Sequence, residues 1–271
     1  MLFSVVYYKI YVMNGKVFVF SGTGNNLASA KRLASEFDLE IVHITDELGD
    51  KKPSFEGETG ILLFPTYGLG VPDTVRKFIG SGNFNFGYMA VLTAMGSHHG
   101  GSLAEAIRCF KKRGQKVHYS RGILSVENFT HLFGYGPIKK ADFKIERQRK
   151  ITAEIAGDLR QGKTNKRILF RPLSFLVACI TKKGTKIFTT RYKFLPQCTA
   201  CGFCVKICPA NALSMVQTAG GAKPKITRMK CDNCQGCLQL CPNKAIKFGR
   251  VKPESMRYIH KDVTPEELIK R

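Results

Sequence analysis

The chain has 271 residues, of which 44% are hydrophobic, and it carries a formal net charge of +23. Its length allows one domain of ordinary size and a second small one, and its hydrophobic fraction is that of a globular protein. So basic a surface favours acidic proteins, anionic membranes or nucleic acid as partners. Nucleic acid is the least favoured of the three, because no helix-turn-helix, zinc-finger or RRM signature accompanies the charge.

The first thirteen residues are apolar but make a poor signal peptide. They contain Lys9, lack a basic start and are followed by no small-residue cleavage site. Met13 would itself suit a start. We expect residues 1–12 to be an over-extended reading frame or a short additional strand.

Apolar strands alternate with helices over the first 160 or so residues. We predict strands at 16–20, 39–44, 60–65 and 88–93, and a fifth within 117–126. Apolar residues at helical spacing predict helices through 27–37, 75–79, 102–113 and 141–159. This alternation predicts an α/β fold, a doubly wound five-stranded parallel sheet covered on both faces, in a domain spanning 14–163.

Three loops that follow predicted strands are candidates for a binding site, because open sheets of this kind bind ligands at the carboxyl ends of their strands. The first loop is glycine-rich, and its backbone amides, with the hydroxyls of Ser21 and Thr23, could bind a phosphate. The alternative is an ordinary glycine turn before a helix. The loop is neither a Walker loop nor a dinucleotide fingerprint, because Gly-Lys-Ser/Thr is absent and Leu27 takes the sixth place of G-x-G-x-x-G.

We predict that residues 164–190 link two domains. The stretch 164–197 is basic without an acidic residue, and it surrounds the eight-residue apolar run 173–180, which is too short to span a bilayer. This run could lie in a membrane interface with lysines on lipid phosphates. We favour packing between the domains with the charges solvated. Cys179 in this run and Cys109 in a predicted helix are expected to be core residues.

Two cysteine runs near the end of the chain hold eight of its ten cysteines, and each has the spacing C-x2-C-x2-C-x3-C-P. Three thiolates two residues apart can bind three corners of a [4Fe-4S] cubane, while the fourth, followed by proline, reaches the other cluster. We therefore predict two [4Fe-4S] clusters with crossed ligation in a domain spanning 191–250. One is expected on Cys198, Cys201, Cys204 and Cys241, and the other on Cys231, Cys234, Cys237 and Cys208.

Zinc and disulfides are the other uses of clustered cysteines. Zinc sites use two pairs of cysteine or histidine with a long spacer, whereas each run here offers one thiolate too many for a tetrahedral ion. Disulfides would need an oxidising compartment. We expect a cytoplasmic protein, with peripheral membrane contact through 164–197 as the other possibility. The predicted polar tail, 251–271, could begin a helix at Thr264 and Pro265.

The run Phe20-Ser-Gly-Thr-Gly-Asn25 is similar to the FMN-phosphate loop of flavodoxins. Together with the cysteine runs it gives nearly the whole chain a resemblance to flavodoxin-domain ferredoxins, in which a flavodoxin-like domain precedes a small α+β two-cluster ferredoxin domain. The resemblance implies FMN, with its phosphate on the first loop and its ring between the second and third. The FMN-binding residues it implies are Ser21, Gly22, Thr23, Gly24, Asn25, Asn26, Pro65, Thr66, Tyr67, Gly68, Thr93, Ala94, Met95 and Gly96.

One residue departs from the flavodoxin pattern. Flavodoxins usually end the phosphate loop in threonine, where this chain has Asn26, so an amide replaces a hydroxyl. Tyr67 is a candidate to stack on the flavin, and Gly68 to turn its peptide toward flavin N5, although both could be turn residues. His98 and His99 could tune the flavin, although loop histidines are more often solvated.

These parts together predict an electron-transfer flavoprotein of an anaerobic or microaerobic cytoplasm. Single electrons would pass between two clusters and FMN, and so between a low-potential donor and an acidic-faced partner protein. The alternative is a flavin-dependent reductase of a quinone, a nitro compound or another flavin, fed by the clusters. Whether the chain is an enzyme therefore stays open. We do not expect direct NAD(P)H oxidation, because no dinucleotide fingerprint follows Leu159.

Overall fold

The computed structural model describes residues 14–49, 52–129, 136–165, 180, 191–227, 230–249 and 251–269. The expectation for residues 1–12 lies outside these ranges. So does most of the predicted linker, including Cys179 and all of the apolar run except Ile180.

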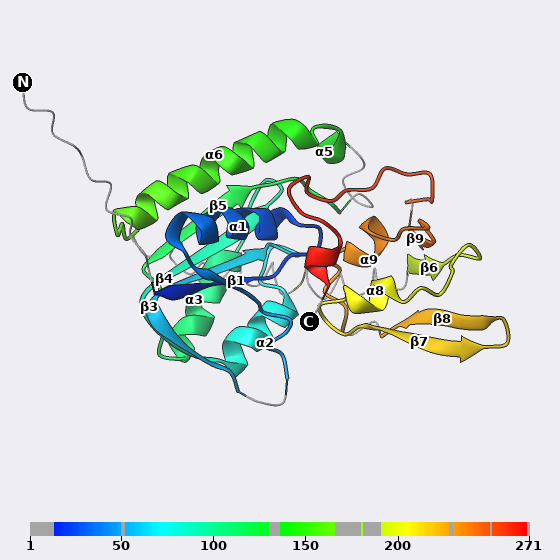
Figure 1. The fold of residues 1–271 in the computed structure, drawn as a ribbon, viewed down its shortest axis with the longest axis horizontal. Helices are drawn as coiled ribbons and strands as arrows, with labels where there is room; N and C mark the ends of the chain where they lie inside the picture. Colours follow the sequence, from blue (N-terminus) through cyan, green and yellow to red (C-terminus); the bar gives the residue numbers. More distant parts are fainter. Residues whose placement is uncertain are drawn as a thin grey trace, which may run out of the picture.

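Five parallel strands form one sheet in the order β2-β1-β3-β4-β5 (Figure 1). This is the flavodoxin-like order of doubly wound folds, whose switch point lies between β1 and β3. The predicted five-stranded parallel sheet is thus confirmed. The strands are β1 (Gly15–Val19), β2 (Glu40–His43), β3 (Ser54–Pro65), β4 (Asn83–Met95) and β5 (Tyr119–Leu124).

Strands β3 and β4 begin earlier than predicted. Their carboxyl-terminal halves are continuously buried, whereas their first halves alternate between exposed and buried residues. The strands predicted at 60–65 and 88–93 were based only on the continuous apolar runs. The inward residues of the alternating halves, Phe55, Phe84 and Phe86, pack around Phe18 and extend the core. The first halves are therefore half-buried strand, which period-2 alternation identifies.

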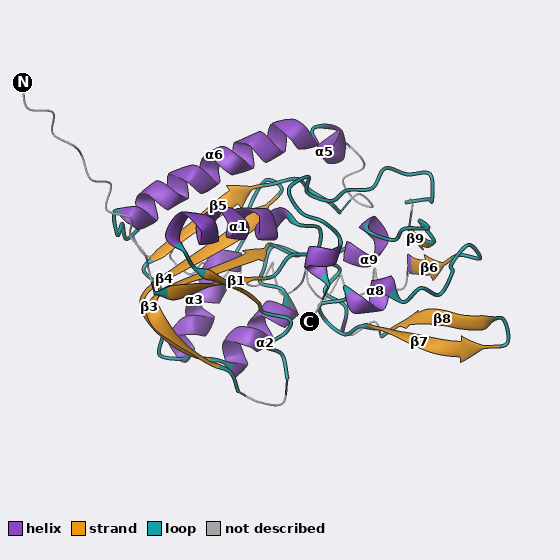
Figure 2. Cartoon of the chain, in the orientation of Figure 1, coloured by secondary structure: helices purple, strands orange, loops and turns teal. Residues whose placement is uncertain are grey.

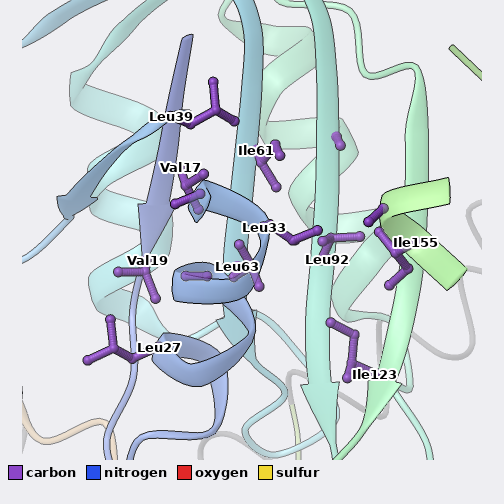
Figure 3. Close-up of a cluster of buried hydrophobic side chains, with 14 of the residues drawn as sticks. Val17, Val19, Leu27, Leu33, Leu39, Ile61, Leu63, Leu92, Ile123 and Ile155 are labelled. Atoms are coloured by element: carbon purple, nitrogen blue, oxygen red, sulfur yellow. The ribbon is translucent and has the colours of Figure 1, made fainter. Parts of the chain in front are cut away.

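Helices cover both faces of the sheet, with α1 and α6 on one side and α2 and α3 on the other (Figures 1 and 2). Alternate residues of β1 point to opposite faces. Val17 and Val19 join the cluster beneath α1 and α6, shown in Figure 3, whereas Phe18 and Phe20 join the cluster with α2 and α3. The helices are α1 (Asn25–Phe37), α2 (Asp73–Ser81), α3 (Ser102–Lys112), α5 (Gly136–Lys139) and α6 (Ala141–Arg160).

Residues 191–249 form a small α+β unit at one end of the sheet (Figure 2). Strands β6 and β9 pair with each other, and β7 and β8 form a hairpin that extends away from the sheet. The two cysteine runs fold alike: Ala200 and Asn233 both have φ 56°, and Asn211 and Lys244 both have φ 48°. The elements are β6 (Tyr192–Phe194), α8 (Phe203–Lys206), β7 (Leu213–Thr218), β8 (Gly221–Ile226), α9 (Gly236–Gln239) and β9 (Ile246–Phe248).

The last described residues, 251–269, fold back against the sheet domain, residues 14–165. Tyr258, His260 and Val263 are buried, and Val263 packs in the same cluster as α1. Instead of a helix from Thr264, this C-terminal segment has one 3-10 turn, η3 (Glu266–Leu268), in which the Thr264 amide donates to Glu267 Oε2 at 2.8 Å. In the part of the chain that the structure describes, no helix combines the length and apolar character needed to cross a membrane.

Candidate functional site

A pocket opens at the carboxyl ends of β1, β3, β4 and β5, where the fold places ligand sites. The pocket encloses about 760 Å³, including its open mouth. Its walls are the three predicted loops, the loop after β5 and two residues of the second cysteine run. The residues lining it are Ser21, Gly22, Thr23, Asn25, Asn26, Pro65, Thr66, Tyr67, Gly68, Ala94, Met95, Gly96, Ser125, Val126, Glu127, Asn128, Phe129, Asp232 and Asn233.

Two of the predicted FMN-binding residues, Gly24 and Thr93, do not line this pocket. Gly24 precedes α1 with φ 95°, a conformation that favours glycine, and its amide donates to Ser21 Oγ at 3.1 Å. Thr93 is fully buried, and its hydroxyl lies 3.0 Å from that of Thr66, which also contacts Ser102. Gly24 and Thr93 therefore support the conformation of the loops without lining the pocket.

The phosphate loop fits an anionic ligand. Asn26 is 2% exposed and lines the pocket, yet its amide oxygen has no hydrogen-bond partner among the described residues. A buried amide left unpaired is costly, and the assignment of its oxygen and nitrogen can be reversed, so a phosphate oxygen could accept a hydrogen bond from it. Helix α1 begins here without a side-chain cap, which leaves backbone amides facing the pocket. The loop therefore suits the phosphate of FMN.

Replacing Asn26 with alanine should weaken FMN binding about 10- to 150-fold, because a charge-assisted hydrogen bond contributes about 1.5–3 kcal/mol. Riboflavin lacks the phosphate and serves as the matched ligand. Its affinity should stay within about twofold of the wild-type value. Fluorescence titrations of both flavins measure this, and an equal loss for both would assign Asn26 to the fold of the pocket.

Thr23 and Asn25 of the same loop form hydrogen bonds with distant parts of the chain. Asn128 Nδ2 donates to Thr23 Oγ1 at 2.8 Å, which leaves the Thr23 hydroxyl proton available to a ligand. Asn25 donates to Val126 O at 2.9 Å and accepts from the Tyr258 hydroxyl at 2.6 Å. The loop after β5 and the C-terminal segment therefore fix the loop in shape.

His260 fastens the C-terminal segment to the same loop. Its backbone amide donates to Thr23 O at 2.9 Å, and its fully buried ring accepts at Nδ1 from the Asp262 amide at 3.2 Å. Burial lowers the pKa of His260 to about 4, against an opposing contribution from Asp262, and Arg149, Lys261 and Lys31 lower it further. The ring is thus neutral in the folded protein at neutral pH.

The free energy of unfolding should therefore fall by about 1 kcal/mol between about pH 7 and pH 5.5, because the unfolded chain takes up a proton at His260 that the fold excludes. Since the folded pKa is below the unfolded one, the loss occurs between about pH 6.5 and pH 4. Urea unfolding at both pH values measures it. His260→Asn, which cannot titrate there, should lack this part of the slope; a variant that keeps it would contradict the assignment.

Tyr67 lies between the pocket and the second cysteine run. Burial raises the pKa of its phenol well above the usual range, and Cys234 and Asp232 add to the effect. Tyr67 and Gly70 exchange two backbone hydrogen bonds of 3.1 Å around Gly68 and Leu69, which both have positive φ. This is a type I′ turn. The carbonyl of Gly68 and the amide of Leu69, which form the central peptide of this turn, take part in neither of these two hydrogen bonds.

The histidines considered for tuning the flavin lie elsewhere: neither His98 nor His99 lines the pocket. The loop after β5 and the pair Asp232 and Asn233 line the pocket without having been predicted from the sequence. The rule that ligands bind at strand ends would have found residues 125–129, because they follow the last strand. No local pattern indicates that residues between two cysteines reach a pocket in the other domain.

The eight clustered cysteines surround two further cavities. Cys198, Cys201, Cys204 and Cys241 line the outer cavity, of about 370 Å³, and Cys208, Cys231, Cys234 and Cys237 line the inner cavity, of about 340 Å³. Each set combines three cysteines of one run with the fourth of the other, as crossed ligation requires. Among the described residues, no three His, Cys, Asp or Glu side chains converge on one point as ligands of a single metal ion do.

Comparison with known proteins identifies the family of the cysteine-rich region. Residues 197–249 match the family described as the 4Fe-4S dicluster domain. The chain joins a flavodoxin-like domain to a ferredoxin-type domain. Among solved structures, the two-electron reduced flavodoxin of Megasphaera elsdenii matches at 19% identity and a TM-score of 0.29, over 40% of this chain and 84% of that one. No curated protein matches the chain.

The ferredoxin-type domain, residues 191–249, suits an iron-sulfur cluster in its hydrogen bonding. Three backbone amides donate to cysteine sulfurs: Ala212 to Cys208, Asn233 to Cys231 and Ala245 to Cys241, at 3.2–3.3 Å. Such bonds favour the thiolate that binds iron. Without iron, burial and neighbouring thiolates raise the pKa of Cys204 to about 11, and the same causes raise the pKa values of Cys234 and Cys237 well above the usual range. Iron must therefore displace protons from buried thiols.

Proposed function

We propose that this protein is a one-electron carrier with two [4Fe-4S] clusters and one FMN. The clusters are held by the cysteines of the outer and inner cavities, and the FMN by the loops of the pocket. When bound, the flavin accepts two electrons in single steps, whereas each cluster carries one. Electrons pass between a low-potential donor and a partner protein.

One observation carries this proposal. Asp232 lines both the flavin pocket and the inner cavity, so one residue of the second cysteine run forms the wall between them. Its carboxylate accepts from the amides of Asp73 and Thr74, both at 3.1 Å, at the start of α2. This caps α2 and fixes the cysteine run against the sheet domain. A cluster in the inner cavity therefore neighbours the flavin.

The two cavities are neighbours as well. Cys204 of the outer set packs in the same hydrophobic clusters as Cys237 of the inner set. Phe194 of β6 and Ile226 of β8 belong to these clusters as well. The order of sites is thus outer cavity, inner cavity, flavin pocket. The protein's own task is to keep these sites close, dry and fixed in position.

Stepwise reduction of the anaerobically purified holoprotein tests the function. Substoichiometric dithionite should reduce clusters and flavin in one connected titration, with clusters followed by electron paramagnetic resonance and flavin by visible absorbance. A one-electron acceptor protein should then reoxidise all three sites, whereas NAD(P)H should reduce none. A flavin that stays oxidised while the clusters are reduced and reoxidised would contradict the proposal. Sustained turnover of a quinone or nitro compound would favour the reductase instead.

A further inference from the structure

The ferredoxin-type domain carries a large excess of positive charge. Residues 191–249 contain nine Lys and Arg against a single acidic residue, Asp232. That carboxylate faces inward, where it accepts the two amides of α2. No other acidic side chain belongs to this domain.

The sheet domain, by contrast, carries charges of both signs. Several of its basic residues are paired with carboxylates, as in Arg76 with Glu105, Arg121 with Glu154 and Arg149 with Asp262. In the ferredoxin-type domain, seven lysines have no ion-pair partner among the described residues. They are Lys193, Lys206, Lys223, Lys225, Lys230, Lys244 and Lys247.

Two of these lysines are placed at a cost to the fold. Lys193 on β6 lies directly opposite Lys247 on β9 in an antiparallel pair. Like charges in this position destabilise a sheet, and a bound anionic surface would relieve the repulsion. Three of the other lysines flank residues that line the outer cavity: Lys223 and Lys225 flank Pro224, and Lys244 lies between Asn243 and Ala245.

The outer cavity also reaches the surface at this point. Cys201 is the exposed member of the eight clustered cysteines. Around it lie uncharged residues of the cavity wall, including Thr199 and Asn243, which are joined by a hydrogen bond of 2.7 Å. Transient protein interfaces usually have an uncharged central region surrounded by charged residues.

We infer that the face around Cys201 is the docking surface for a redox protein whose own surface is acidic. This inference rests on the proposed function and adds the site and charge of the partner. In each encounter one electron passes from the reduced centre of the donor protein to the outer cluster. The donor is oxidised by one electron and the cluster is reduced by one electron; no bond forms and no proton moves. Lysines around the site steer the acidic protein toward the cluster edge.

Stopped-flow electron transfer tests the inference with a reduced acidic [2Fe-2S] ferredoxin as the probe. Its second-order rate constant with the holoprotein should fall at least about tenfold as salt rises from low to high ionic strength, because screening removes attraction. The double variant Lys193→Glu/Lys247→Glu should lose about tenfold at low salt. The matched control Lys111→Glu/Lys112→Glu changes the same charge on exposed lysines of α3 and should lose less than about threefold.

A rate that is independent of salt, or equal losses in the two variants, would overturn the docking surface. Sedimentation with phosphatidylserine vesicles tests a membrane as the other possible partner. If the holoprotein binds the vesicles and the Lys193→Glu/Lys247→Glu variant does not, while both react with ferredoxin at the same rate, the docking surface for a protein is contradicted. Dithionite titration of the same variants keeps the two proposals apart. If electrons from dithionite still reach the flavin, the carrier function stands and the docking surface alone falls.

Discussion

Replacing Cys208 with alanine should empty the inner cavity of its cluster, although Cys208 belongs to the first cysteine run. Iron should fall from about eight to about four atoms per chain. Cys231, Cys234 and Cys237 should then become open to alkylation, whereas the four cysteines of the outer cavity stay protected. The physical reason is that Cys208 lines the same cavity as those three. Alkylation followed by mass spectrometry gives the answer residue by residue.

The Cys241→Ala variant should show the opposite pattern, because Cys241 lines the outer cavity. Cys198, Cys201 and Cys204 should be alkylated, whereas the four cysteines of the inner cavity stay protected. Cys109→Ala is the control: this cysteine lies on α3, away from both cavities, and its removal should change neither iron content nor protection. Alkylation of the first run in the Cys208 variant would show that each run binds its own cluster.

Replacing Gly22 with alanine should disturb the flavin site and the inner cluster together. A Cβ atom at this position would lie 2.7 Å from Cys234 O and 3.0 Å from Cys234 Cβ, which is closer than packed atoms allow. Overpacking of this kind costs about 1–3 kcal/mol, so FMN affinity should fall about tenfold and iron content should drop. FMN titration and iron analysis of the same preparation measure both effects.

Gly157 offers a matched control for this substitution. It lies within α6, and a Cβ atom there would meet nothing within 4 Å. Alanine at 157 should leave both cofactors unchanged and stabilise the helix by about 0.5–1 kcal/mol. Wild-type FMN affinity and iron content in the Gly22 variant would mean that the two domains do not meet at this glycine in the folded protein.

Gly22 also shows where reasoning from a motif falls short. A glycine in such a loop is expected to let a phosphate approach the backbone. In the structure the missing side chain makes room for the Cys234 carbonyl, and Gly236 faces Gly22 in turn, since a Cβ atom there would lie 2.9 Å from Gly22 O. The residue type was informative, but the neighbour that requires it lies more than 200 positions away in the sequence.

The sequence by itself determined the parts whose signals are local. Alternating apolar runs fix the order of strands and helices, and the spacing of thiolates along a short run fixes their chemistry, because both depend on neighbours a few residues apart. Only the tertiary structure decided how the parts meet. Asp232 lines the pocket at the strand ends, and His260 binds the loop after β1 through its backbone amide, because burial and long-range hydrogen bonds depend on the folding of distant segments against one another.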